Sequence, residues 1–64
     1  MKGEIKFFNE TKGFGFIKVT GQKDIFFHKS ALQKGETVDE GDYVEFRVIT
    51  TERGQAAESI TKVS

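Results

Sequence analysis

The sequence contains no cysteine, no proline and no tryptophan, and it has one histidine among 64 residues. Without cysteine there can be no disulfide, and a single histidine leaves no ligand set for a structural zinc ion. A chain this short buries only about 60% of the surface that its unfolded form exposes. Its stability must therefore come from a thin apolar core and from backbone pairing.

Long hydrophobic runs are also absent. The first ten residues, MKGEIKFFNE, carry a charge about every second position, which does not fit a secretory signal. No apolar run approaches the roughly 20 residues of a membrane-spanning helix. We expect a soluble cytoplasmic protein with no membrane partner, built as a single domain over residues 1–64.

The net charge is zero, which by itself argues against a partner rich in phosphate. The charge is unevenly distributed, however. Residues 1–34 hold seven lysines and three acidic residues (+4), whereas residues 35–64 hold three basic and seven acidic residues (−4). Such asymmetry can produce one basic side. Simple solubilising charge would explain it equally well.

The apolar residues do not recur with the 3.6-residue period of an amphipathic helix; they form short β-rich runs. We predict strands over residues 2–8, 13–19, 24–28, 43–50 and 55–63. Tight links join the second strand to the third and the fourth to the fifth. The polar segment 30–42 is the long connection, with a helical turn at residues 30–32. Five short strands predict a closed all-β barrel, since closure removes exposed edges, but their number does not separate an OB-type barrel from an SH3-like one.

Side chains alternate across a strand, so every second residue shares a face. The ionised Lys18 and Asp24 must face water, because a domain of this size has no room to bury them. The neighbours that share their face are predicted to lie on the solvent side: Phe14, Phe16, Phe26 and His28. The opposite set is predicted to form the core: Ile5, Ile17, Val19, Ile25, Phe27, Val44, Phe46, Val48 and Ile60.

An outer face of three phenylalanines and an imidazole, flanked by Lys6, Lys12 and Lys18, combines stacking surfaces for bases with cations for phosphates. Gly13 and Gly15 would leave these rings accessible. The alternative is that the aromatics belong to the core and that Lys18 reaches outward past them. For the adjacent Phe7 and Phe8, alternation exposes only one ring unless a bulge intervenes, and the residues alone leave that choice open.

The stretch KGFGFI, residues 12–17, matches most of an RNA-binding signature. In the four-stranded RNA-recognition fold this signature lies late in the chain, whereas only eleven residues precede Lys12 here. The chain instead resembles the bacterial cold-shock proteins over its whole length. The shared motifs are KFFN (6–9), KGFGFI (12–17), DIFFHKSAL (24–32), VEF (44–46) and RGQAA (53–57).

The resemblance implies a five-stranded antiparallel OB-type barrel that binds single-stranded RNA and DNA, prefers pyrimidines and acts as an RNA chaperone. Because favouring the unpaired form melts weak hairpins by mass action, we expect this activity to need no ATP. It also implies that Phe7, where the family usually has an exposed tryptophan, is the outward ring. By matching position, the nucleic-acid-binding residues would be Lys6, Phe7, Lys12, Phe14, Phe16, Asp24, Phe26, His28 and Arg53.

The chain departs from the family pattern at several positions. Phe7 offers a smaller ring than tryptophan, and Lys29 occupies a usually aromatic position. The connection at residues 34–39 is shorter than usual and lacks a phenylalanine, and Gln55 replaces a common proline. We therefore expect weaker stacking, partly offset by a phosphate contact from Lys29, and a steeper salt dependence.

Other functions find less support in the residues. His28 is the only imidazole and has no nucleophile to activate, although Asp24 on the same face could orient it, so we expect no enzyme. We likewise expect no cofactor, metal or small-molecule substrate, and a monomer. An aromatic groove for proline-rich peptides, and a structural role inside a ribonucleoprotein, remain the alternatives.

Overall fold

The computed structural model describes residues 1–33 and 36–63, and this part of the chain forms five strands and one 3₁₀ helix. The elements are β1 (Lys2–Asn9), β2 (Phe14–Lys18), β3 (Ile25–His28), η1 (Lys29–Ala31), β4 (Tyr43–Thr51) and β5 (Gly54–Lys62). All five predicted strands are confirmed to within one residue at each end, and the predicted helical turn begins one residue early. In ranges 1–33 and 36–63 no helix is long and apolar enough to cross a membrane.

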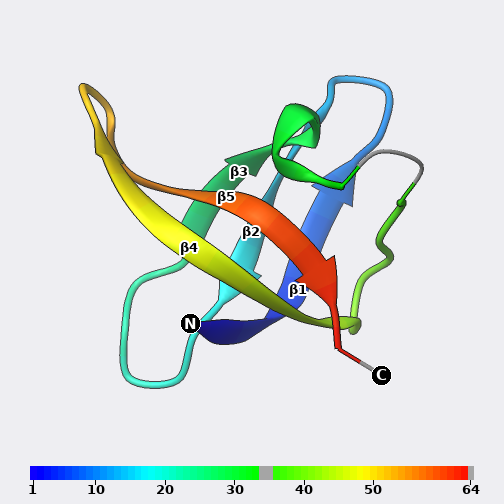
Figure 1. Cartoon of the computed structure of the whole chain (residues 1–64), viewed down its shortest axis with the longest axis horizontal. Helices are drawn as coiled ribbons and strands as arrows, with labels where there is room; N and C mark the ends of the chain where they lie inside the picture. Colours follow the sequence, from blue (N-terminus) through cyan, green and yellow to red (C-terminus); the bar gives the residue numbers. More distant parts are fainter. Residues whose placement is uncertain (34–35, 64) are drawn as a thin grey trace.

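The strands close into a barrel in the order β1-β2-β3-β5-β4, with β4 returning to β1 (Figure 1). Pairing is antiparallel except between β3 and β5, where Phe26 and Phe27 pair in parallel with Ala56 and Ala57. The predicted barrel is confirmed, but the predicted antiparallel arrangement does not hold at this pair. The reason is parity: a closed ring with an odd number of strands cannot alternate in direction all the way round.

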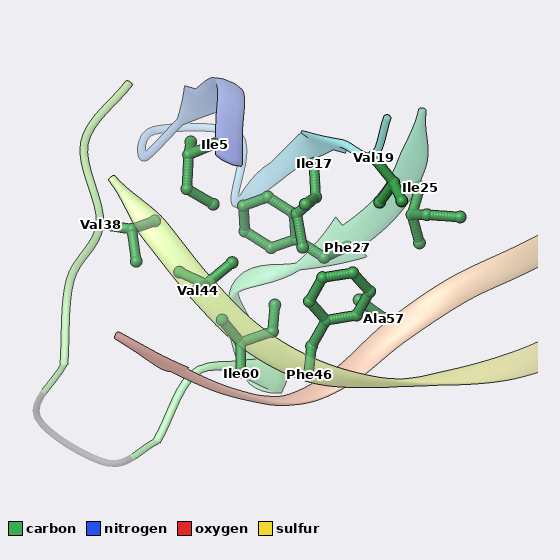
Figure 2. Packing of buried hydrophobic residues seen from close by; sticks show 10 residues of the cluster. All are labelled: Ile5, Ile17, Val19, Ile25, Phe27, Val38, Val44, Phe46, Ala57 and Ile60. Carbon is green, nitrogen blue, oxygen red and sulfur yellow. The ribbon is translucent and has the colours of Figure 1, made fainter. Parts of the chain in front are cut away.

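The core lies between two layers, because the β4–β5 hairpin crosses over β1, β2 and β3 (Figure 1). In Figure 2 the rings of Phe27, from β3, and Phe46, from β4, lie among aliphatic side chains of both layers. Eight of the nine predicted core residues are buried, and Val48 packs half-buried against them. Val38 and Ala57 are also buried but were not predicted. Val38 lies in the long connection, which is not a strand, so the alternation of side chains could not predict that it faces the core.

Gly15 lies in the middle of β2 and points inward, between the outward Phe14 and Phe16. A Cβ atom at Gly15 would lie 2.7 Å from Cζ of Phe27 and would also clash with the carbonyl oxygen of Phe7. The sequence suggested that Gly15 keeps the outer rings accessible. Its space is instead needed on the inner side, where the Phe27 ring lies directly beneath the strand.

Candidate nucleic-acid interface

Strand register brings the predicted outward residues together on the face formed by β1, β2 and β3. Phe14 pairs with His28, and Phe16 pairs with Phe26 on one side and with Phe7 on the other. Residues at paired positions project to the same side of a sheet. We call Phe7, Phe14, Phe16, Phe26 and His28 the aromatic platform. The four members predicted from alternation are all on it.

A bulge in β1 resolves the choice between Phe7 and Phe8. Ile5 pairs with Ile17, but the next pair is Phe7 with Phe16, so Lys6 is an extra residue on β1. The bulge lets Lys6 and Phe7 both face outward while Phe8 returns to the interior. Phe8 then stacks on the buried ring of Phe27, with centroids 5.5 Å apart and planes inclined by 21°. The resemblance to cold-shock proteins predicted the same outward ring.

The four phenylalanine rings of the platform contact one another and are only partly exposed. Phe14 is central, with ring centroids 6.0 Å from Phe7, 6.3 Å from Phe16 and 6.2 Å from Phe26. Phe16 and Phe26 meet edge to face at 5.9 Å. Phe7 and Phe26 are 38% and 36% exposed, whereas Phe14 and Phe16 are half-buried by their neighbours. This mutual packing fixes the rings before any ligand arrives.

His28 is oriented by Ser30 and not, as the sequence suggested, by Asp24. Its Nδ1 accepts a hydrogen bond from the backbone N–H of Ser30 at 3.1 Å and lies 3.0 Å from Oγ of Ser30. Through the first of these contacts His28 caps the N-terminus of η1. Because a backbone N–H can only donate, the neutral ring carries its proton on Nε2, where it can donate to a ligand. Sequence reasoning missed Ser30. The signal for it was a hydroxyl residue two positions after the histidine, where a helical turn was expected.

Asp24 instead forms an ion pair with Lys6, with Nζ 2.8 Å from Oδ2. The pair links the β1 bulge to the start of β3 at the rim of the platform. Both side chains keep solvent contact, at 58% and 32% exposure, so the pair contributes little to stability. It does leave a cation and a carboxylate side by side next to the rings. Among the residues that the structure describes, no three or more His, Asp or Glu side chains are grouped to hold a metal ion.

Lys12 and Lys29 lie at the end of the platform near Phe14 and His28. The N–H of Lys12 donates to Oδ1 of Asn9 at 2.9 Å, which fixes the β1–β2 turn. Gly13 adopts φ = +77°, and the alkyl chain of Lys29 packs where its Cβ would be, with Cδ at 3.1 Å. Lys29 thus lies over this turn, at the rim, with an exposed side chain. Residues 34–35 of the shortened connection lie outside the described residues.

Arg53 reaches the platform from the β4–β5 hairpin. Its N–H donates to Oγ1 of Thr51 at 3.2 Å, and that hydroxyl donates to the carbonyl of Gly54 at 2.8 Å. The parallel pairing of β3 with β5 sets Ala56 beside Phe26. Together these elements enclose a hollow of about 250 Å³ lined by Phe26, Thr51, Arg53, Gln55 and Ala56. Thr51 and Ala56 were not predicted, because they meet Phe26 only through the non-local β3–β5 pairing.

Known proteins share this sequence and this fold. The family model described as the 'cold-shock' DNA-binding domain matches residues 1–63. The chain is 50% identical to the cold shock-like protein CspLB of Listeria monocytogenes, over 95% of this chain and 96% of that protein. It is 45% identical to the cold shock protein CspA of Staphylococcus saprophyticus, over 97% of each.

A solved structure described as Drosophila Unr CSD456 superposes with a TM-score of 0.81 at 34% identity, over 98% of this chain and about a quarter (26%) of that one. Proteins with this domain bind nucleic acid, act in general as chaperones for it and are in general not enzymes. Because the family model matches nearly the full length and both relatives align almost from end to end, this chain belongs to the cold-shock domain family.

Proposed function

We propose that the protein binds single-stranded RNA and DNA by stacking bases on the aromatic platform, and that it acts as a monomeric RNA chaperone without ATP. One observation carries the proposal: five aromatic side chains from β1, β2 and β3 lie on one outer face that the fold does not need for its core, and four of them are in ring contact. Each base stacked on such a ring contributes about 1 to 3 kcal/mol.

The residues around the platform have distinct roles in this proposal. The cations Lys6, Lys12, Lys29 and Arg53 contact phosphates along the rim. His28 donates from Nε2 to a base edge, since Ser30 occupies Nδ1. Asp24, held by Lys6, accepts a hydrogen bond from an exocyclic amino group.

Recognition is broad, because every base has a π-face. The platform favours pyrimidines for a geometric reason. Neighbouring ring centroids are 5.9 to 6.3 Å apart and most ring planes are steeply inclined to one another, so each exposed surface is about the size of a single ring.

Chaperone activity follows from mass action. A protein that binds only the unpaired form of a hairpin stabilises that form by RT ln(1 + [L]/Kd), which is about 2.7 kcal/mol at a hundredfold excess over Kd. This is enough to open weak hairpins without any chemical energy source, and release depends only on dilution or competition.

Fluorescence anisotropy tests the proposal. Labelled oligothymidylate, a labelled duplex and a labelled proline-rich peptide are each titrated with the protein at two salt concentrations. We expect the single strand to bind best, with a log–log salt slope of up to about −3, since single strands lose about 0.7 per phosphate contact and four cations line the rim. Tighter binding of the peptide, with no salt dependence, would overturn the proposal in favour of a proline-rich partner.

A further inference from the structure

A row of outward side chains continues beyond the platform across three strands. Glu4 of β1 pairs with Lys18 of β2 on one side and with Tyr43 of β4 on the other. Because paired residues project to the same side of a sheet, Lys18, Glu4 and Tyr43 lie on one outer surface. Lys18 also follows Phe16 at the next outward position of β2, so this surface is continuous with the platform.

The surface along this row is hollowed. A hollow of about 470 Å³ is lined by residues that include Lys6 and Asp24 at the rim of the platform. A second, of about 360 Å³, is lined by residues that include Lys2, Thr20 and Tyr43. Both hollows are lined by Glu4 and Lys18. The two hollows therefore adjoin at Glu4 and Lys18, and we call them together the groove; its lining runs from the ion pair of Lys6 and Asp24 to Tyr43.

Tyr43 stands at the far end of this groove and has no role in the core. Tyr43 is 63% exposed, more than Phe7 or Phe26 on the platform, whereas Val44 and Phe46 of the same strand are buried. An exposed aromatic ring is a stacking surface, and the phenol adds a hydrogen-bond donor. Lys2 and Lys18 line the same hollow.

We propose that the groove carries the continuing strand of the single-stranded nucleic acid and that Tyr43 stacks one further base. Lys18 and Lys2 contact the phosphates on either side of that base. Glu4, half-buried between them, repels phosphate and accepts hydrogen bonds from amino groups, so it keeps the base edge, and not the backbone, over the middle of the groove. This subsite rests on the proposed function and lengthens its footprint.

Two labelled oligothymidylates separate the subsite from the platform: one of about 6 and one of about 10 nucleotides, within the site sizes typical of OB folds. We expect Tyr43→Ala to weaken binding of the longer strand by about five-fold or more, which corresponds to the loss of one stacked base, and to change the shorter by less than about two-fold. Tyr43→Phe keeps the ring and should bind both strands like the wild-type protein. Circular dichroism checks that the variants are folded.

Lys18→Ala and Lys23→Ala form a charge-matched pair. Both lysines are exposed, but only Lys18 lines the two hollows. Lys18→Ala should lower the salt slope for the longer strand by about one phosphate contact, and Lys23→Ala should not.

Suppose that the wild-type protein binds both strands. If folded Tyr43→Ala binds both with wild-type affinity, or loses the same factor in affinity for both, the proposed subsite is wrong and the platform stands. If neither strand binds the wild-type protein, the proposed function fails, and the subsite fails with it.

Discussion

Single residues set the spacing between the platform and the core. The ring of Phe27 lies directly beneath Gly15 and leaves no space for a side chain there. This close approach places Phe14 and Phe16 of the same strand just above the buried ring. Ser30 fixes the ring of His28 through Nδ1. Neither residue is part of the stacking surface, yet both determine where its members lie.

Gly15→Ala should lower the free energy of unfolding by more than Gly21→Ala does, up to about 3 kcal/mol or beyond, because the new methyl group has no space against Phe27. Urea unfolding measures the change. Gly21→Ala is the comparison: Gly21 has φ = +77° but no atom within 4 Å of a built Cβ, so it reports backbone strain alone, about 1 kcal/mol. A loss at Gly15 no larger than that at Gly21 would contradict the close approach.

Lys29→Phe exchanges a rim cation for a ring. We expect tighter binding of oligothymidylate at high salt, from the added stacking surface, and a salt slope smaller by about 0.7, from the lost phosphate contact. Anisotropy at several salt concentrations measures both quantities. If affinity and slope are both unchanged, Lys29 makes no contact with the bound strand.

At the scale of elements, alternation within a strand was enough to predict four of the five members of the aromatic platform, and pairing between strands explains the fifth. The two-residue alternation of side chains within β2 and β3 predicts the outward positions of Phe14, Phe16, Phe26 and His28. The outward Phe7 follows from a bulge against β2, which the residues of β1 alone do not encode. Closure of the barrel brings β3 beside β5 in parallel and brings Thr51 close to Phe26, and neither contact can be read from one strand. The burial of Val38 is set by the path of the long connection, which has no hydrophobic periodicity from which to predict it.

A second bulge occurs in β5, where Glu58 pairs with Arg47 and Thr61 with Glu45, so that three steps on β5 face two on β4. Within it, the exposed Ser59 adopts φ = +54°. A left-handed conformation costs a non-glycine residue roughly 1 to 2 kcal/mol. Glycine avoids this cost, but it loses more conformational entropy on folding, which cancels part of the gain in stability. Ser59→Gly should therefore raise the free energy of unfolding by about 0.5 to 1 kcal/mol in urea titrations. Ser59→Ala should not, and stabilisation by alanine would show that the bulge is unstrained.

The turn before β4 is held by Asp42, whose carboxylate accepts a hydrogen bond from the N–H of Asp39 at 2.8 Å and lies 3.4 Å from Nζ of Lys62. The hydrogen bond from Asp39, helped by Lys62, lowers the pKa of Asp42 below its usual 3.8. A lowered pKa gives stability that is present above pH 3.8 and is lost as the pH falls through the lower folded-state value.

The excess stability of the wild-type protein over Asp42→Asn should accordingly be largest near pH 7 and shrink once the pH falls below 3.8. Thermal unfolding of both proteins across this range measures it. A difference that stays constant at the most acidic pH would mean that the charge of Asp42 does not stabilise the turn.

For the whole molecule, the net charge is zero, but the basic and acidic residues are distributed unequally between the two layers. The half of the sequence with excess lysine builds β1, β2 and β3, which carry the platform, whereas the acidic half supplies the connection and the β4–β5 hairpin (Figure 1). Local cations, and not the sum over the chain, decide whether phosphate is attracted to a surface. A neutral protein of this size can therefore present a basic rim around an aromatic face.

The most direct test of that account is the affinity of labelled oligothymidylate for folded Phe16→Ala, beside wild-type protein and Phe16→Tyr, at two salt concentrations. Phe16 contacts Phe14 and Phe26 on the platform. Removing its ring should therefore cost about 1 to 3 kcal/mol of binding free energy, or about 5- to 150-fold in Kd. Phe16→Tyr should bind like the wild-type protein, and all three proteins should bind more weakly at high salt. Equal binding by folded Phe16→Ala and the wild-type protein would contradict stacking on the aromatic platform.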